Sequence, residues 1–479
     1  MNNKIVVYIL GWVMTFLSAF LLLPCLVSLI YREETGIYFF IMAVLTFICG
    51  KIITHKKPEK GHFYAKEGFV SVALSWVILS ILGAVPLWAS GEIPHFIDAL
   101  FEIVSGFTTT GASVVPNVEV LSHTALFWRS FSHWIGGMGV LVFMMAILPM
   151  AGADNMHLLR AESPGPIVSK LVPRMRKTAG ILYLIYLGLT ILQSILLLIS
   201  GMPLFESICM SLGTAGTGGF GLVADSAASY TAVQQIIITV FMVLFGVNFS
   251  FYYLILMKKG KEALNMEEVK WYFAIFGIAS VLIAIDLTKN VSELLHNLNL
   301  ATFQVASVMT TTGFATADFN LWPTFSKNIL VMLMFVGACA GSTGGGIKVS
   351  RFIIYAKTAV KEISHLIHPR SVKVVKMDDK TVSDETIRTT HMYLIIYMFI
   401  FVASLFLLSL DKYDMVTNFT AVAATINNIG PGLEAVGPMG GYGGFSVLSK
   451  MVMILDMLIG RLEIFPMLIL FYPGVWKRS

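Results

Sequence analysis

Stretches of about 20 residues without Asp, Glu, Lys or Arg recur from one end of this chain to the other, and an α-helix of that length crosses a bilayer. Charged residues make up 13% of the 479 residues and hydrophobic residues 56%. A typical soluble domain carries about 25% charged residues, so this chain has too few charges to cover a water-exposed surface. We therefore predict an all-α polytopic membrane protein.

Ten such runs are candidate spans, and one of them is interrupted. They lie at 5–31, 35–50, 68–90, 121–151, 179–201, 230–257, 267–289, 327–358 (the interrupted one), 388–410 and 447–472. The first run lacks a small-residue cleavage signal, so we interpret it as a span rather than as a signal peptide. An even number of spans would place both termini on the same side of the membrane.

The basic residues indicate which side that is. With the amino terminus in the cytoplasm, the outer loops 91–120, 202–229 and 290–326 contain no Lys or Arg, and 411–449 contains only Lys412. Because Lys and Arg are retained in cytoplasmic loops, we expect both termini in the cytoplasm. The net charge of +5 then reflects the inner loops and not nucleic-acid binding. The inner segments 51–67, 152–178, 258–270, 348–388 and 477–478 hold 25 of the 33 Lys and Arg residues.

Acidic residues are present in the outer loops, which are poor in Lys and Arg. Any one of them is readily explained as an ordinary solvated charge, but as a set they predict an outer mouth that attracts cations. The set is Glu92, Asp98, Glu102, Glu119, Glu206, Asp225, Glu293, Asp318, Asp411, Asp414 and Glu434.

Four outer segments repeat one pattern, in which a Phe is followed by small or apolar residues and then by a Gly. A helix of about 11 residues is roughly 16 Å long, half the thickness of a hydrocarbon core of about 30 Å. We therefore predict four re-entrant pore helices, each followed by a Gly-containing turn. The Phe and Gly residues pair as Phe101 with Gly111, Phe205 with Gly218, Phe303 with Gly313, and Phe419 with Gly430.

This repeat predicts the domain organisation. Residues 1–67 form two extra amino-terminal spans. Four pseudo-fourfold span–pore helix–span repeats then surround one pore, because non-helical backbone at membrane depth must be buried in protein or line a watery cavity. The predicted repeats are 68–178, 179–266, 267–385 with a Gly-rich interruption, and 386–479.

The four turns have the composition of a potassium filter. A potassium ion gives up its hydration shell only to several backbone carbonyls, and Gly freely adopts the backbone angles that aim them inward. Small Thr side chains permit close approach, and the negative ends of the helix dipoles favour a cation. The predicted filter residues are Thr109, Thr110, Gly111, Gly216, Thr217, Gly218, Thr311, Thr312, Gly313, Asn428, Ile429 and Gly430.

The interrupted span contains five Gly in the ten residues 337–346. Each Gly costs a helix about 1 kcal/mol relative to Ala, so the helix should break there and leave a movable gate beneath the filter. The alternative is close helix packing through small residues. The predicted gate residues are Gly337, Ala338, Gly341, Ser342, Thr343, Gly344, Gly345, Gly346 and Lys348.

Two further features of the inner half concern cofactors and charge. Lys348 comes one residue too late for a phosphate-binding loop, and no strand precedes it, so we expect no organic cofactor in this chain. The ligand expected from the filter is potassium, as the transported ion. Arg461 lies in the last span, where an Arg costs about 2.5–3.5 kcal/mol and usually faces the interior or a watery path. We expect it to face the pore below the filter, with a structural pairing to another span as the alternative.

Residues 98–468 resemble the Trk/Ktr/HKT superfamily of potassium-uptake proteins, in particular its Trk-type bacterial pore subunit, as do the two extra spans. The resemblance implies a potassium filter at the four turns, a homodimer, a cytosolic nucleotide-binding (RCK/KTN-type) regulatory subunit and a location in the bacterial inner (plasma) membrane. The matching stretches are SGFTTTGASV (105–114), FSHWIGGMGVLVFMMAILP (131–149), GTGGFG (216–221), TTTGFATADFNLWP (310–323), GACAGSTGGGIKVSR (337–351), NNIGPGLEAVGP (427–438) and GRLEIFPML (460–468).

The function predicted from the sequence is potassium uptake through one pore, with no enzymatic activity, no nucleic-acid partner and membrane lipid as the surroundings. One alternative is the potassium-translocating subunit of an ATP-driven pump, given a weaker similarity to the Kdp pump. Another is a membrane-embedded lipid-modifying enzyme, which would need a grouped catalytic set that the outer loops lack. Passive conduction and ion-coupled transport both stay open. The basic segment 361–388 is a candidate docking surface.

Overall fold

The computed structural model describes residues 2–56, 65–139, 175–288, 293–370 and 373–476. The predicted inner residues 152–174 and the second half of the span 121–151 lie outside these ranges. Within them all the regular secondary structure is helical apart from one hairpin of two strands, β1 (Lys376–Met377) and β2 (Lys380–Thr381). Six of the described helices are long and apolar enough to cross a membrane. The prediction of an all-α polytopic membrane protein is confirmed.

The helices follow one order four times, after an amino-terminal hairpin of α1 (Asn3–Tyr31) and α2 (Thr35–Thr54). A long helix leads to a short helix and then to a second helix. The first set is α3 (Ala65–Ala89), α4 (Phe96–Phe107) and α5 (His123–Gly137), and the second is α8 (Met175–Ile199), α9 (Leu204–Gly216) and α10 (Ala232–Gly246) with α11 (Phe249–Leu256). The third is α13 (Glu267–Leu287), α14 (Leu294–Met309) and α15 (Thr324–Val336) with α16 (Val349–Ile367), and the fourth is α17 (Asp384–Leu408), α18 (Met415–Ile426) and α19 (Val447–Arg461) with α20 (Phe465–Phe471) and α21 (Pro473–Trp476).

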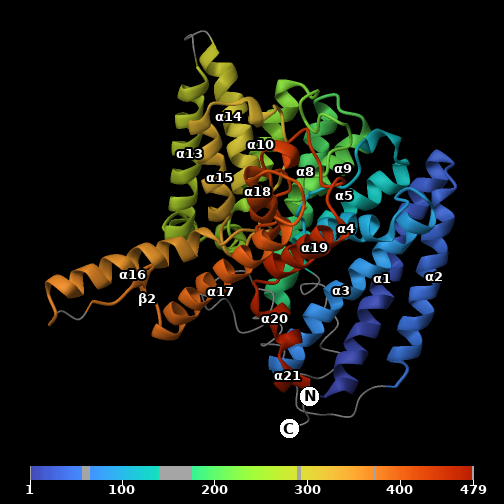
Figure 1. Cartoon of the computed structure of the whole chain (residues 1–479), viewed down its shortest axis with the longest axis horizontal. Helices are drawn as coiled ribbons and strands as arrows, with labels where there is room; N and C mark the ends of the chain where they lie inside the picture. The colour runs from blue at the N-terminus through green and yellow to red at the C-terminus, as the bar shows by residue number, and fades with distance from the viewer. Residues whose placement is uncertain (1, 57–64, 140–174, 289–292, 371–372, 477–479) are drawn as a thin grey trace.

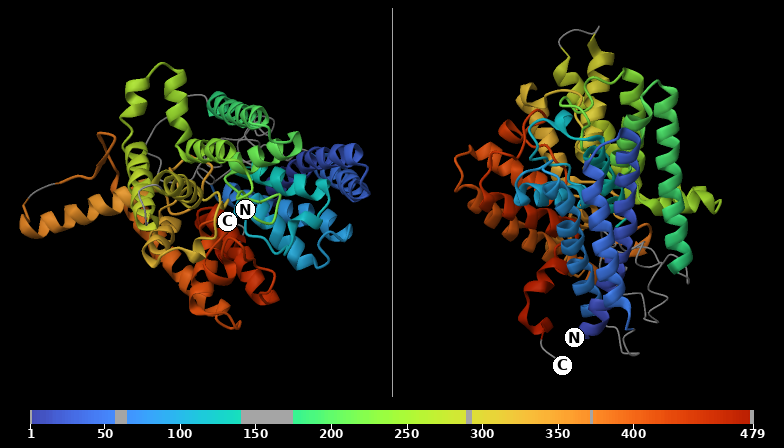
Figure 2. Two further views of the ribbon diagram at one scale, coloured as in Figure 1. Left: turned by 90° about the horizontal axis from the view of Figure 1, so that it is seen from above. Right: turned by 90° about the vertical axis from the view of Figure 1, so that its right-hand side faces the viewer.

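Small elements connect these sets. Helix α12 (Gly260–Leu264) precedes α13, and single 3₁₀ turns η1 (Val118–Val120), η4 (Phe319–Leu321) and η5 (Glu434–Val436) follow three of the short helices. Seen from above in Figure 2, the sets pass around the molecule in chain order, from cyan through green and yellow to red, with the α1–α2 hairpin on the outside. Helix α16 projects from the body in Figure 1.

Side-chain caps start several of these helices. Ser122, Thr231 and Ser446 each accept a hydrogen bond from a backbone amide of the first turn of α5, α10 and α19, which satisfies a donor that the helix leaves unpaired. Asp414 caps α18 in the same way, and the hydroxyl and amide of Thr417 hold the pKa of the Asp414 carboxyl below its usual value. Polar residues between the apolar runs therefore mark where these four helices begin.

The break predicted in the span 327–358 is confirmed, since α15 ends at Val336 and α16 begins at Val349. Two spans expected to be continuous are broken as well. In 230–257, α10 and α11 meet at 88°, and the Asn248 side chain accepts from the amide of Ser250 to start the new helix. In 447–472, α19 and α20 are separated because Pro466 cannot donate a backbone hydrogen bond and its ring excludes a continuous helix.

The two ends of the described chain lie at the same end of the molecule (Figure 1). Val6 of α1, Val70 of α3 and Val475 of α21 pack into one small apolar cluster there. The main apolar core surrounds the four short helices, whose carboxyl ends lead into the Gly-containing turns. The fold therefore carries these turns into the interior of the molecule, where four stretches of non-helical backbone meet.

Candidate functional site

The four short helices end in the same backbone motif. At each end a residue takes the left-handed conformation, and the next amide donates to a carbonyl five residues back, which is the Schellman pattern of a helix end. These next-residue bonds run from Thr110 to Ser105, Gly218 to Gly213, Thr312 to Ser307, and Ile429 to Ala424, at 2.8–2.9 Å. The left-handed residues are Thr109, Thr217, Thr311 and Asn428, with φ of 57°, 55°, 59° and 56°.

This conformation is unusual for the residues that adopt it. Helices ordinarily end on a left-handed Gly, and a β-branched residue with positive φ is an outlier. Here three of the four are Thr. Strained backbone of this kind costs about 1–3 kcal/mol a residue and persists where the surroundings over-determine it, commonly at functional sites. The repeated strain marks these turns as the candidate site.

A Gly with positive φ follows two residues after each left-handed residue. The four are Gly111, Gly219, Gly313 and Gly430, with φ of 79°, 69°, 88° and 99°. The sequence pattern predicts Gly218 as the equivalent of Gly111, Gly313 and Gly430. The backbone angles show that the equivalent residue is Gly219, one residue later. Gly216 and Thr217 belong to the turn, Gly218 occupies the position of Thr110, and Gly219 is the true counterpart of Gly111.

The four turns form a closed ring. A Cβ atom added to any of the four glycines would collide with a backbone carbonyl of the next turn in chain order, and the fourth glycine meets the first turn. The turns therefore approach too closely for any side chain, which is why Gly is required there. The oxygens so met belong to Gly218 from Gly111, Thr312 from Gly219, Ile429 from Gly313, and Thr110 from Gly430.

Pairs of Thr hydroxyl groups are hydrogen-bonded within the first and third turns. The Oγ1 atoms of Thr108 and Thr110 are 2.8 Å apart, and those of Thr310 and Thr312 are 2.7 Å apart. The second and fourth turns have no Thr at these places. In the fourth turn, the side-chain amide of Asn428 donates to Thr110 Oγ1 at 2.9 Å. This bond joins the fourth turn to the first.

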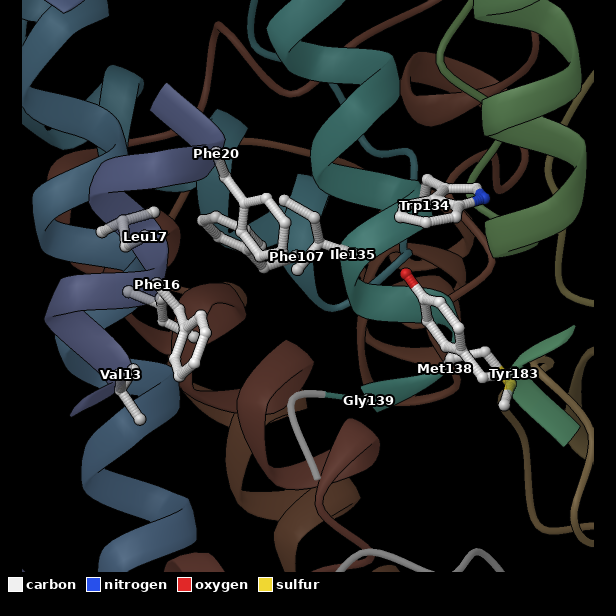
Figure 3. A pocket seen from close by; sticks show the side chains of 11 residues that line it. Val13, Phe16, Leu17, Phe20, Phe107, Trp134, Ile135, Met138, Gly139 and Tyr183 are labelled. Carbon is white, nitrogen blue, oxygen red and sulfur yellow. The ribbon is translucent and has the colours of Figure 1, made fainter. Parts of the chain in front are cut away.

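The ring opens on one side into a polar cavity. Gly111, Gly219, Gly313 and Gly430 all line it, and the Tyr442 hydroxyl donates to the Gly430 carbonyl at 2.6 Å. A separate pocket is lined by apolar side chains of α1, α3, α4, α5 and α8, among them Phe16, Phe20 and Phe107 (Figure 3). Of these two hollows, the one at the ring is lined by the four positive-φ glycines and by polar groups, whereas the other is lined mainly by apolar side chains.

Two of the predicted mouth charges are engaged in ion pairs. Glu102 accepts from Arg129 at 2.8 Å, with both side chains almost fully buried, and Asp98 accepts from Lys450 at 2.6 Å. Glu102 is therefore not a solvated charge, whereas Asp98 stays 21% exposed and its place in the predicted mouth stays a prediction. Glu102 also accepts from the amide of Val114, beyond the first turn, while Arg129 donates to the carbonyl of Gly221, beyond the second. The pair thus fastens neighbouring turns together.

Replacing Arg129 by Met should strongly destabilise the protein, because it leaves the Glu102 carboxylate buried without a cation. Breaking a buried pair on one side costs about 3–5 kcal/mol. The check is the thermal unfolding midpoint in detergent, which should fall in the single variant and recover in part in the double variant Arg129→Met with Glu102→Gln. A single variant that melts with the parent would show that the pair does not stabilise this region.

The Gly-rich segment lies beneath the ring and is largely buried. The amide of Gly345 donates to Thr311 Oγ1 at 2.6 Å, and that of Gly346 donates to the carbonyl of Asn427 at 3.1 Å. These contacts join the segment to the third and fourth turns. It doubles back on itself, since a Cβ on Gly337 would lie 2.8 Å from Gly346 Cα.

The other side of the segment docks on the break between α10 and α11. The amide of Cys339 donates to the carbonyl of Gly246 at 3.1 Å, the hydroxyl of Thr343 to that of Phe245 at 3.2 Å, and the amide of Phe249 to that of Gly341 at 3.0 Å. Backbone groups left unpaired at one broken helix are thus satisfied by the other broken helix, as membrane-depth backbone requires.

The remaining predicted gate residues complete this segment. Ala338 accepts from the amide of Val349 at 3.1 Å, and the Ser342 hydroxyl donates to the carbonyl of Cys339 at 2.6 Å. A Cβ on Gly344 would lie 2.8 Å from the carbonyl oxygen of Thr310, at the end of α14. The buried ammonium of Lys348 donates to the carbonyl of Gly344. All nine predicted gate residues therefore belong to one folded segment or its immediate flank.

Arg461 joins the Gly-rich segment to the first set of helices. Its guanidinium donates to the carbonyl of Thr343 at 2.8 Å and to the carbonyls of Gly136 and Gly137 at the end of α5. The contact with α5 is the structural pairing that the sequence left open. That Arg461 also faces the pore stays a prediction.

The fold and this ring of turns define a polytopic α-helical membrane protein built around one axis. A family model described as cation transport protein, TrkH, matches residues 35–477. The Trk system potassium uptake protein TrkH of Salmonella typhimurium is 35% identical, with 100% of both chains covered. TrkG of Escherichia coli is 33% identical over 99% of both chains. The crystal structure of the potassium transporter TrkH from Vibrio parahaemolyticus matches with a TM-score of 0.89 at 31% identity, over 100% of both chains.

The chain belongs to the TrkH family of cation transport proteins. The resemblance to the Trk type of pore subunit, which rested on seven short stretches of sequence, is thereby confirmed over the full length of the chain.

Proposed function

We propose that this chain takes up potassium through a single pathway that passes the ring of four turns. The observation that carries the proposal is the closed ring, in which glycines of each turn lie against carbonyls of the next. Rings of backbone carbonyls replace the hydration shell of a potassium ion. The relatives named as potassium uptake proteins share the full length of the chain, which supports the same ion here.

The proposed filter comprises the four corrected turns, and the proposed gate is the Gly-rich segment below them. Because that segment contacts the third and fourth turns directly, an ion leaving the ring on this side would meet it. Lys348 and Arg461 donate to its carbonyls and so place positive charge next to the path. The filter positions are Thr108–Gly111, Gly216–Gly219, Thr310–Gly313 and Asn427–Gly430.

The assembly and location follow from the family resemblance as part of the same proposal. We place the chain in a bacterial plasma membrane with both termini in the cytoplasm, as a homodimer with a cytosolic nucleotide-binding regulatory subunit. The packing of α1, α3 and α21 at one end supports the common side of the termini, and the retention of Lys and Arg in inner loops supports its being the cytoplasm.

Flux through the purified chain in liposomes tests this function. We expect inward rubidium movement down its gradient without ATP, inhibited by external potassium more than by sodium. Vesicles without protein are the control. Uptake that requires ATP and a second polypeptide would instead support the pump-subunit alternative, and equal competition by sodium would contradict the proposed potassium filter.

A further inference from the structure

The buried side chain of Glu268 contacts the Gly-rich segment, although Glu268 belongs neither to the ring of turns nor to that segment. Glu268 is the second residue of α13 and is only 3% exposed. No sequence pattern singled it out, because it lies in an ordinary acidic first turn beside Glu267. It is nevertheless aimed at the Gly-rich segment, which lies more than 70 residues further along the chain.

Glu268 accepts hydrogen bonds from three places around the proposed gate: the Gly-rich segment, the start of α16, and the break between α10 and α11. Its Oε1 accepts from the amide of Ala340, within the Gly-rich segment, at 2.6 Å, and from the amide of Ser350, in the first turn of α16, at 3.1 Å. Its Oε2 accepts from the amide group of Asn248, at the break between α10 and α11, at 3.4 Å. One side chain thus ties the segment to the two helix ends that flank it.

The bonds of Glu268 differ in arrangement from the other bonds that dock this side of the segment. The bonds of Cys339 and Thr343 to α10 each join the segment to one helix end, whereas one carboxyl group of Glu268 accepts from three separate places at once. The amide of Ser350 also belongs to the start of a helix, where negative charge is favoured. Release of this one side chain would therefore loosen the segment from both neighbouring helix ends.

We propose that Glu268 is the latch that holds the Gly-rich segment in its closed position across the pathway. The proposal rests on the proposed gating function of that segment. Opening would require the amide of Ala340 to leave the carboxylate, while the bond to Ser350 can persist on α16. Glu268 is thus a positioning residue, which acts on ion flow through the segment and not by contact with the ion.

Cys339 supplies a direct reporter of this motion. It follows Ala338 within the segment, is fully buried and carries a free thiol. In a chain whose other cysteines, Cys25, Cys49 and Cys209, are replaced by Ala, a water-soluble maleimide should label Cys339 slowly. We expect Glu268→Ala to raise the labelling rate about tenfold, the effect of losing one hydrogen bond to a charged group.

Two further variants separate latching from general damage. Glu268→Gln keeps one oxygen for the amide of Ala340 without the charge, so its labelling rate should lie between those of the parent and Glu268→Ala. Glu267→Gln makes the same change one residue earlier, where the carboxylate pairs with Lys357 of α16 at 2.6 Å. It should leave Cys339 as protected as in the parent.

Rubidium flux into liposomes is measured on the same variants and should rise in the same order. The latch would be overturned if Cys339 were labelled as slowly in Glu268→Ala as in the parent. It would also be overturned if Glu267→Gln raised the labelling rate as much as Glu268→Ala does. Exposure of Cys339 without increased flux would keep the latch and overturn the gating role of the segment instead. If Glu268→Ala fails to fold, the comparison of Glu268→Gln with Glu267→Gln decides.

Discussion

Replacing Gly111 by Ser should reduce the preference for potassium over sodium by about five- to 150-fold, the effect of about 1–3 kcal/mol of overpacking in the ring. Gly111 has a φ of 79°, and an added Cβ would collide with the carbonyl of Gly218 in the next turn. The ring must widen or twist to admit the side chain, so its carbonyls no longer match one ion. The measurement is the ratio of rubidium to sodium permeability in liposomes.

Gly91 offers a matched control for this substitution. It has nearly the same backbone angle, a φ of 80°, but no atom lies within 4 Å of an added Cβ. Gly91→Ser therefore imposes the backbone strain without the collision, and its permeability ratio should equal that of the parent. Gly313→Ser should behave like Gly111→Ser, since it meets the carbonyl of Ile429. Unchanged selectivity in both ring variants would count against the filter assignment.

Replacing Arg461 by Gln should raise the basal rubidium flux about tenfold while leaving ion selectivity unchanged. The guanidinium holds the carbonyl of Thr343 in the Gly-rich segment, and hydrogen bonds to charged groups are among the stronger ones in proteins. Its loss also removes a positive charge that repels cations. The measurement is rubidium uptake in liposomes, with thermal unfolding recorded on the same preparation.

Arg461→Lys provides the control for charge. Lysine keeps the positive charge but lacks the planar fork that reaches Thr343 and the end of α5 together. We expect a flux between those of the parent and Arg461→Gln. A lowered unfolding midpoint with unchanged flux would mean that Arg461 serves only to pair α19 with α5.

The fold could be predicted from the sequence wherever one local property decides it. Uncharged runs placed α1, α2, α13 and α17 within a few residues of their observed ends, apart from the polar first turn of α17. The density of glycine between residues 337 and 346 predicted the break after Val336. Small residues followed by Gly predicted the four turns, because few other residues tolerate such close approach.

Prediction was incomplete where several local solutions were equally good or where the partner lay far along the chain. Gly218 and Gly219 are adjacent glycines, and only the backbone angles show which one is equivalent to Gly111. Two breaks that the span prediction missed do have a local signal in the sequence: Asn248 caps α11, and Pro466 lacks the backbone amide that a continuous helix needs. By contrast, the contact of Glu268 with Ala340 arises from tertiary packing, and no local pattern records it.

The reciprocal docking of the two broken helices also constrains how a nascent chain matures. The carbonyl of Phe245 finds its partner in Thr343, which leaves the ribosome 98 residues later. Until then the corner between α10 and α11 exposes bare polar backbone, which a lipid environment penalises. The second quarter of the molecule is therefore completed only when the third has been synthesised, so a product truncated before residue 337 should be a substrate for membrane proteolysis.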